Sequence, residues 1–274
     1  MQIPIHVAIP SYNNAAGLKI LLEQLSKQNF ASITVLDDAS TDETQQTIGM
    51  FPEVGTVRSK INLGTVGANN LILRAMPKNG FLLCIDSDMI MMQQDTPEKL
   101  SKFLESHAHI AIGVGKIVGQ KSQQRIRWNF NYDLNPLRSL LAFITYHPAR
   151  FFRTVPLIGT SLRQLSCLFV QHLAVDIEQK VDWGIEGFFF VRCDLFKELG
   201  GFDERFKRFH EGPDLFLRLR KLGYEAWYTP AIAALDTDQG TGTSLYRRYH
   251  WFRSTIIYFY KHPSRLLLYK YPRP

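Results

Sequence analysis

Residues 81–88 read Phe-Leu-Leu-Cys-Ile-Asp-Ser-Asp, an apolar run that ends in two carboxylates one residue apart. The apolar part, residues 81–85, predicts a strand buried on both faces, as in a parallel sheet covered by helices. Asp86 and Asp88 follow its carboxyl end, which is where open α/β sheets bind ligands. Alternate residues of an extended segment point the same way, so both carboxylates are expected to face one partner. Mg²⁺ or Mn²⁺ carrying a nucleotide diphosphate suits them, because such cations combine one or two carboxylates with phosphate oxygens and water. The alternative is a strand-end turn with two solvated acids.

Strand and helix signals alternate on both sides of this stretch. Two helix starts are specific: Ser40 with Glu43 forms a capping-box pattern, and Thr96 precedes a proline at the first helical position. Further strands are expected at residues 3–9, 33–36, 54–57, 110–114, 188–191 and 225–228, the last ended by Pro230, with helices at 213–222 and from Ser244. This β-α-β-α order predicts an α/β fold with a parallel, nucleotide-binding sheet.

Bulk properties narrow the class of protein. With 274 residues, 45% hydrophobic and 21% charged, the chain has the composition of an ordinary folded protein. Its three cysteines show no metal-type Cys-x-x-Cys spacing, which favours a reducing compartment. The first residues lack signal-peptide features, and no run of about 18 apolar residues predicts a membrane span. The net charge of +7 fits an anionic surface or anionic substrates, and no nucleic-acid motif accompanies it.

A set of short motifs occurs in one order between about residues 3 and 235. They are Ile9-Pro10-Ser11-Tyr12-Asn13, residues 35–42 (Val-Leu-Asp-Asp-Ala-Ser-Thr-Asp), Asn62-Leu63-Gly64 with Asn69-Asn70, Asp86-Ser87-Asp88, Gly200-Gly201-Phe202-Asp203-Glu204, and residues 214–218 with Gly223-Tyr224 and Pro230. The ordered set resembles the inverting family 2 glycosyltransferases, which have the GT-A fold. Within that family, Trp183, Gly187, Arg192 and the basic tail look most like the rhamnosyltransferase-like enzymes of bacterial surface polysaccharide assembly.

The resemblance implies an α/β, GT-A fold in which helices flank a mostly parallel central sheet. Residues 1–118 are expected to form a Rossmann-like half that binds the nucleotide sugar. Residues 119–243 are expected to form the acceptor-binding half, with a basic amphipathic helical insert at about 136–173. Residues 244–274 are expected to form a basic, aromatic helical tail.

The resemblance also implies a donor site. Pro10 and Tyr12 are placed beside a uracil or thymine ring, and Asp38 is placed to accept the imide N–H of that base. Asn62 and Gly64 open a turn that approaches the nucleoside, where glycine lets the backbone come close. Asp86 is expected to face the ribose or a metal-bound water. Each piece has a structural alternative: a turn without a ligand, or the capped start of a helix. Asn69 and Asn70 are expected to contact either the ligand or neighbouring loops.

Metal binding is assigned by the same resemblance to Asp88, with Asp86. Relatives often carry a His after the strand beyond Pro230, but residues 234–240 here read Ala-Leu-Asp-Thr-Asp-Gln-Gly. Asp236 or Asp238 is an alternative oxygen ligand for Mn²⁺ or Mg²⁺, and Asp238 is our choice. A loop that closes over the donor is the other interpretation of this segment.

The catalytic base is expected in His210-Glu211-Gly212-Pro213-Asp214. The family usually has Glu-Asp-x-Asp here, so Gly212 replaces the central acid, which is often the proposed base. We therefore predict Glu211 as the base that deprotonates the acceptor hydroxyl. Asp214 is predicted to be structural or the second choice, since an acid in a first helical turn also complements the helix dipole.

These features predict a metal-dependent, inverting glycosyltransferase that uses a UDP- or dTDP-sugar and a glycan or lipid-linked acceptor in cell-surface polysaccharide synthesis. We expect no nucleic-acid partner and a peripheral position on the cytoplasmic face of the membrane. The basic, aromatic segments at 136–173 and 246–271 would meet anionic lipid there; alternatively, they pack on the sheet with their arginines solvated.

Two other functions stay open. One is a catalytically weakened relative that acts as a membrane-associated binding or scaffold protein, and the other is a nucleotidyltransferase, although residues 10–17 lack its glycine-rich, basic loop. A dehydrogenase is disfavoured, because no Gly-x-Gly-x-x-Gly follows the first strand.

Overall fold

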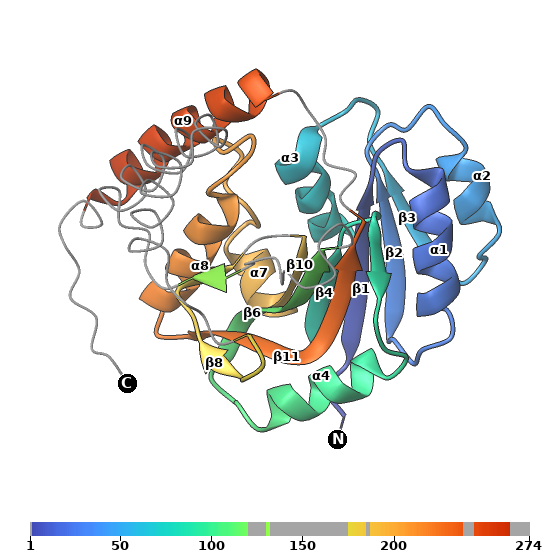
Figure 1. Ribbon diagram of the computed structural model, residues 1–274, viewed down its shortest axis with the longest axis horizontal. Coiled ribbons are helices and arrows are strands. Elements are labelled where there is room, and N and C mark those ends of the chain that lie inside the picture. Colours follow the sequence, from blue (N-terminus) through green and yellow to red (C-terminus); the bar gives the residue numbers. More distant parts are fainter. Residues whose placement is uncertain (1, 120–129, 132–174, 185–186, 238–243, 264–274) are drawn as a thin grey trace, which may run out of the picture.

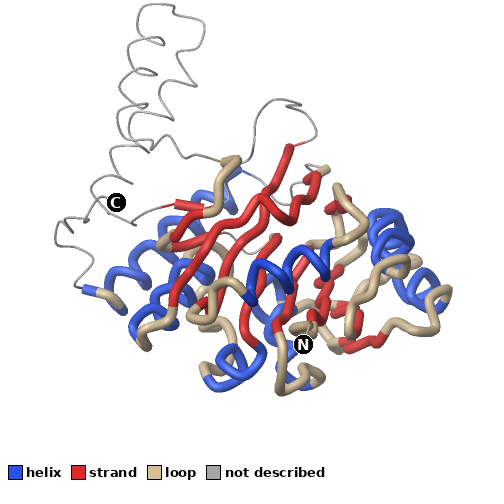
Figure 2. The backbone as a smooth tube through the Cα atoms, turned by 90° about the horizontal axis from the view of Figure 1, so that it is seen from below, coloured by secondary structure: helices blue, strands red, loops and turns tan. Residues whose placement is uncertain are grey.

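The computed structural model describes residues 2–119, 130–131, 175–184, 187–237 and 244–263. In these ranges the chain forms one central sheet with helices on both faces (Figures 1 and 2). The strand order is β3 (Gly55–Arg58), β2 (Ser32–Asp37), β1 (Ile5–Ser11), β4 (Phe81–Ile85), β10 (Phe188–Arg192), β6 (Ile110–Gly119), β11 (Glu225–Asp236) and β5 (Met89–Met91), and β8 (Gln179–Lys180) also pairs with β11. A separate ribbon joins β7 (Phe130–Asn131) to β9 (Trp183–Gly184).

Helices cover the two faces of the sheet in two groups. One face carries α1 (Ala15–Leu25) and α4 (Thr96–Glu105), and the other carries α3 (Gly64–Leu71), α7 (Cys193–Glu198) and α8 (Glu211–Lys221). The short α2 (Thr44–Gly49) lies beside α1, and a 3₁₀ turn, Ile72–Arg74, extends α3. The long α9 (Ser244–Lys261) lies beside α8, at the end of the molecule away from α1 and α2 (Figure 1).

Strand β4 is buried on both faces, as the sequence predicts. Phe81, Leu83 and Ile85 belong to the core under α1 and α4, whereas Leu82 and Cys84 belong to the core under α3, α7 and α8. Each fully buried side chain of this size contributes about 1.5–3 kcal/mol relative to an exposed one. Because β4 holds both cores together, the position of its carboxyl end is fixed from both sides.

The sheet is mixed in its strand directions. Strands β1, β2, β3 and β4 pair in parallel, as does β11 with β6, whereas β10 is antiparallel to both β4 and β6. The expectation of an α/β fold with helices on the sheet is confirmed. Only some of the neighbouring strands pair in parallel, although a mostly parallel sheet was expected. An apolar run such as residues 188–191 predicts a buried strand but carries no information on its direction.

Three local expectations are corrected. Helix α2 begins at Thr44, and the Ser40 hydroxyl accepts the Asn13 N–H (3.1 Å) instead of capping the helix. Helix α4 begins at Thr96 with Asp95 as its N-cap, and the Thr96 N–H donates to Gln28 Oε1 (3.0 Å). Strand β11 runs through Pro230, which is accommodated by a register shift between Thr229 and Ala233.

The predicted C-terminal helix is confirmed by α9, whereas the predicted insert at 136–173 lies outside the described residues. No described helix has both the length and the apolar character of a membrane span. The three-part division of the chain stays a prediction.

Gly113 in β6 tests how tightly this sheet is packed. A Cβ there would lie 2.3 Å from Cζ of Phe190 and 2.5 Å from the carbonyl oxygen of Trp227. Gly113→Ala is therefore expected to lower the free energy of unfolding by about 1–3 kcal/mol in urea titrations. Gly55→Ala in the edge strand β3 is the matched control, because its Cβ would meet its nearest atom at an ordinary 3.4 Å. Equal stabilities of the two variants would contradict the packing described here.

Candidate active site

The carboxyl ends of three parallel strands meet at one edge of the sheet. Ser11 at the end of β1 pairs with Asp37 at the end of β2, and β4 ends beside them at Ile85. The Asp38 N–H donates to the Ser11 carbonyl (2.9 Å), which joins the first two strand ends directly. The structure therefore brings the loops after β1, β2 and β4 to one side of the sheet.

Asp38 is buried and holds the turn at residues 62–64. Its Oδ1 accepts the Leu63 N–H (2.8 Å) and the Ser59 hydroxyl (3.0 Å), and its Oδ2 accepts the Gly64 N–H (2.9 Å). Gly64 has φ +72°, a conformation that favours glycine. The Asn62 side chain also accepts the Gly64 N–H (2.9 Å). Asp38, Asn62 and Gly64 thus form one unit, and Asp38 positions the turn through backbone contacts that sequence reasoning missed.

The first loop presents an accessible ring. The Tyr12 side chain is 49% exposed, and Pro10 beside it is partly exposed. Behind them, Asn14 caps α1 through the Gly17 N–H (3.3 Å) and donates to the Ser87 hydroxyl (3.1 Å). Asn14 was not among the predicted site residues, yet it ties the first loop to the Asp86–Asp88 corner.

Asp86 and Asp88 form a tight corner with partly exposed side chains. The Asp86 N–H donates to the Gly187 carbonyl (3.0 Å), and its own carbonyl accepts the Met89 N–H (3.1 Å). A Cβ at Gly187 would lie 2.9 Å from Asp86 Oδ2, so glycine leaves room for this carboxylate. The Asp88 carbonyl accepts both the N–H (3.3 Å) and the hydroxyl (2.8 Å) of Thr237 at the end of β11.

The donor set at this corner fits a divalent cation. Asp86 and Asp88 supply carboxylate oxygens at the rim of the sheet, which suits Mg²⁺ or Mn²⁺ bound together with phosphate. Among the described residues no cluster of three His, Cys, Asp or Glu is placed to hold a metal ion. The predicted third ligand, Asp238, lies outside the described residues, and the nearby Asp236 is buried.

Glu211 is a buried carboxyl at the first residue of α8. It is 3% exposed, and its Oε2 has no hydrogen-bond partner in the described part of the chain. Burial raises the pKa of Glu211 to about 7; the negative charge of Asp86 adds to this rise, and Arg208 opposes it. The two preceding residues, Phe209 and His210, have φ +66° and +65°, a strained conformation for side-chain-bearing residues. Such strain is typical of functional sites.

Asp214, one turn further along α8, lies in the opposite environment. Its Oδ1 accepts from Lys261 Nζ (2.7 Å) and His262 Nε2 (2.8 Å), and its Oδ2 accepts from Arg218 Nε (2.9 Å). Burial alone would raise its pKa, but the hydrogen bonds from His262 and Lys261 and the charges of Arg218 and Lys261 bring the pKa below its ordinary value. Oδ1 therefore joins α8 to the C-terminal end of α9, whereas Oδ2 is held by Arg218 one turn further along α8.

The inner face of α9 holds the loop that leads to Glu211. Ser254 Oγ donates to the Arg208 carbonyl (2.7 Å), and Thr255 Oγ1 lies 2.9 Å from His210 Nε2. Burial lowers the pKa of His210 to about 4, so this imidazole is neutral at pH 7. This contact could not be predicted from the sequence, because the helix and the loop are more than 40 residues apart.

The two asparagines of α3 make different contacts, and only Asn70 ties the helix to a distant loop. The Asn70 side chain exchanges two hydrogen bonds with the backbone of Phe202, each 2.9 Å long, and so holds the Gly200–Gly201 turn. Asn69 Nδ2 donates to the Thr65 carbonyl (2.9 Å). Of the two roles left open for Asn70, the structure therefore contains the loop contact.

Glu211→Gln and Asp214→Asn are expected to change stability in opposite directions at pH 8. Because the pKa of Glu211 is raised in the folded state, its contribution to stability is present below its unfolded pKa and is lost as pH rises through about 7. Glu211→Gln should therefore stabilise the protein at pH 8, by up to about 3 kcal/mol, and change it little at pH 5.

The Asp214 contribution has the opposite sign, because its lowered pKa makes the ionised form stabilising above the unfolded pKa. Asp214→Asn should therefore lower the free energy of unfolding at pH 8 by about 3–5 kcal/mol. Urea titrations at both pH values measure both variants. Destabilisation of equal size at pH 8 would contradict the two environments described for these acids.

Comparison with known proteins places this chain in a family. The model of the family "Glycosyl transferase family 2" matches residues 6–159, which is more than half of the chain. Two curated relatives, the poly(ribitol-phosphate) β-N-acetylglucosaminyltransferases TarS of Staphylococcus aureus strains Mu50 and MW2, are each 25% identical over 163 residues. The match covers 54% of this chain, which spans only 27% of the length of those relatives.

Solved structures extend the likeness to nearly the whole chain. S. aureus TarS residues 1–349 with UDP-GlcNAc superposes with a TM-score of 0.57 at 18% identity, covering 88% of this chain and 60% of that one. The mannosyltransferase PcManGT from Pyrobaculum calidifontis with GDP-Man and Mn²⁺ gives 0.59 at 16% identity, covering 99% and 66%. These likenesses establish the GT-A fold. With the family match over its N-terminal half and this fold, the chain belongs to glycosyl transferase family 2.

Proposed function

We propose that this protein is a metal-dependent, inverting glycosyltransferase that moves a sugar from a UDP- or dTDP-type donor to an acceptor hydroxyl. The observation that carries the proposal is one arrangement in a family 2 chain. A partly exposed Asp86–Asp88 corner lies near Glu211, a buried carboxyl whose Oε2 has no hydrogen-bond partner among the described residues. UDP-GlcNAc is the first donor to test, because it is the nucleotide sugar bound to TarS in a solved structure. The narrower likeness to rhamnosyltransferase-like enzymes makes a dTDP-deoxyhexose the second.

On the donor side, the accessible Tyr12 ring supports stacking on a pyrimidine base, which is worth about 1–3 kcal/mol. Asp38 holds the turn of Asn62 and Gly64 in one conformation. The backbone of this turn is proposed to contact the nucleoside. Asp88, with Asp86, is the proposed holder of Mn²⁺ or Mg²⁺, and Asp238 is the proposed third ligand. When bound, the cation supplies Lewis-acid stabilisation of the departing nucleoside diphosphate.

On the acceptor side, we assign Glu211 as the base. The acceptor O–H gives its proton to the Glu211 carboxylate while its oxygen forms a bond to the anomeric carbon and the bond from that carbon to the diphosphate breaks. One in-line displacement inverts the configuration, and therefore one base is enough. A pKa of about 7 suits this role, because a base is most efficient when its pKa lies near the working pH.

The proposed acceptor is a glycan or lipid-linked molecule of cell-surface polysaccharide synthesis, used at the cytoplasmic face of a membrane. TarS, whose name specifies poly(ribitol-phosphate), supports a glycopolymer of this kind. The second candidate is a non-catalytic scaffold, which is favoured by Gly212 in place of the usual central acid. It predicts that no nucleotide sugar is turned over.

Turnover of UDP-GlcNAc and dTDP-sugars with Mn²⁺ tests the proposal through release of free UDP or dTDP. Glu211→Gln should lower turnover by about 100-fold or more, since a general base typically contributes 10²–10⁴-fold. In the unsubstituted enzyme, kcat/KM should fall as the pH is lowered below the pKa of Glu211, because protonated Glu211 cannot accept a proton. The nucleotide affinity of Glu211→Gln should be unchanged.

Glu105→Gln is the matched control, because Glu105 is an exposed acid at the end of α4 and should leave the pH profile intact. Activity of Glu211→Gln within a few-fold of the unsubstituted enzyme would overturn the assignment of the base. Absence of turnover across the whole donor panel would favour the scaffold.

A further inference from the structure

Helix α9 carries a continuous stripe of exposed apolar side chains along the face that points away from the Glu211 loop. We call Leu245, Tyr249, Phe252, Ile256 and Tyr260 the outer stripe; each of them is 55–85% exposed. Their spacing of four, three, four and four residues keeps them within about 80° of the helix circumference. An amphipathic helix whose apolar side faces solvent marks an interaction surface.

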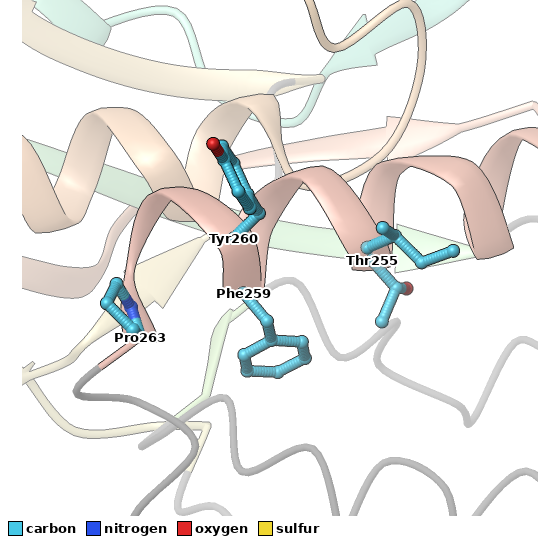
Figure 3. A pocket seen from close by; sticks show the side chains of 5 residues that line it. Thr255, Phe259, Tyr260 and Pro263 are labelled. Atoms are coloured by element: carbon cyan, nitrogen blue, oxygen red, sulfur yellow. The ribbon is translucent and has the colours of Figure 1, made fainter.

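On the opposite face, the C-terminal half of α9 packs against the rest of the protein. Tyr258 and Phe259 pack with Phe206 and Leu217 in a small core. Ser254, Thr255, Lys261 and His262 make the polar contacts to the loop at 203–211 and to Asp214. Figure 3 shows Phe259 and Tyr260 leaving α9 on opposite sides, in keeping with exposed fractions of 8% and 85%. Among the described residues, the outer stripe therefore packs on no other element, while the inner face contacts the loop that leads to the candidate base.

Charge identifies the kind of partner. Residues 244–274 contain seven of the 32 Lys and Arg residues and none of the 25 Asp and Glu residues. The remaining 243 residues hold 25 of each sign, so the formal charge of +7 is that of this terminal segment, in which Lys261 is paired with Asp203 and Asp214. A segment that joins such a charge to a stripe of Tyr, Phe, Ile and Leu has the composition of helices that lie in the interface of an anionic bilayer.

The shape of the surface agrees with a bilayer. Over its 18 residues α9 is about 27 Å long, and the outer stripe runs along most of this length without a polar interruption. A shallow hollow of about 650 Å³, lined by Thr255, Ile256, Phe259, Tyr260 and Pro263, extends the apolar surface at the C-terminal end (Figure 3). Tyrosine suits this position, because its ring is apolar and its hydroxyl reaches water.

We propose that the outer stripe of α9 lies on the surface of an anionic lipid bilayer, with the helix parallel to the membrane. Because a helix is about 10 Å thick, the loop that carries Glu211 then lies about one helix diameter from the lipid. This geometry presents a membrane-anchored acceptor, rather than a soluble one, to the candidate base. The assignment of the acceptor rests on the proposed function, whereas lipid binding by α9 does not.

Co-sedimentation with vesicles tests the inference on the full chain. The unsubstituted protein should bind vesicles of phosphatidylcholine mixed with phosphatidylglycerol, and bind vesicles of phosphatidylcholine alone at least about tenfold more weakly. Raising the salt to about 0.5 M should also weaken binding. Phe252→Asn/Ile256→Asn, which changes two exposed side chains of the stripe, should lower the partition coefficient on anionic vesicles at least about tenfold.

Ile20→Asn/Met50→Asn is the matched control, because these apolar side chains are 48% and 60% exposed on the α1–α2 side of the molecule. It should bind vesicles like the unsubstituted protein. Both double variants should retain the thermal stability of the unsubstituted protein and, without vesicles, its rate of donor hydrolysis. Loss of that rate in every protein would count against the proposed function and leave lipid binding standing.

Three results would overturn the inference. The first is binding of Phe252→Asn/Ile256→Asn to anionic vesicles at the level of the unsubstituted protein. The second is a dimer that this variant converts to a monomer, with no vesicle binding by either, because the stripe would then bind a second copy. The third is a marked loss of thermal stability in this variant, again without vesicle binding, because another segment of the chain would then cover the stripe.

Discussion

Parallel pairing of β1 with β2 and β4 is the constraint on which the site depends, because it brings the loops after three strands to one edge of the sheet. Burial of β4 on both faces fixes the position of the Asp86–Asp88 corner relative to the sheet. Short polar contacts then lock the loops to one another: Asp38 holds the turn at 62–64, and Asn14 joins the first loop to Ser87. Asp38 and Asn14 thus help to build this surface, on which the Tyr12 ring is exposed and the two acids of the corner are partly exposed.

Two acids on α8, three residues apart, show how position alone assigns different chemistry to the same functional group. Asp214 is surrounded by Lys261, His262 and Arg218, and this environment keeps it ionised. Glu211 is buried among the described residues without such partners, and burial, helped by the negative charge of Asp86, raises its pKa to about 7. Pairs of titratable groups with separated pKa values are a common mark of acid–base sites. Burial of Glu211 and the strained backbone of Phe209 and His210 both cost free energy of folding. The contacts that α9 makes with the loop before Glu211 offset this cost.

Sequence reasoning recovers what is local and misses what is long-range. The buried strand at 81–85, the acids after it, the helix expected at 213–222 and the helix from Ser244 all follow from periodicity, punctuation and the family resemblance, although α8 begins two residues earlier than expected, at Glu211. The antiparallel direction of β10 does not, because Phe188–Arg192 has the same apolar pattern in either direction. The backbone contacts of Asp38 and the contact of Thr255 with His210 also escape prediction, since they join residues 25 and 45 positions apart. The metal and base roles follow from residue chemistry and stay predictions.

The central claim is that Asp88, with Asp86, binds a divalent cation that in turn binds the diphosphate of the donor. Calorimetric titration of UDP with and without Mn²⁺, on the unsubstituted protein and on Asp88→Asn, tests it most directly. The account predicts that Mn²⁺ tightens UDP binding at least about tenfold in the unsubstituted protein and not in Asp88→Asn, since a cation stabilises the diphosphate by several kcal/mol. Equal tightening in both proteins, or none in either, would contradict it.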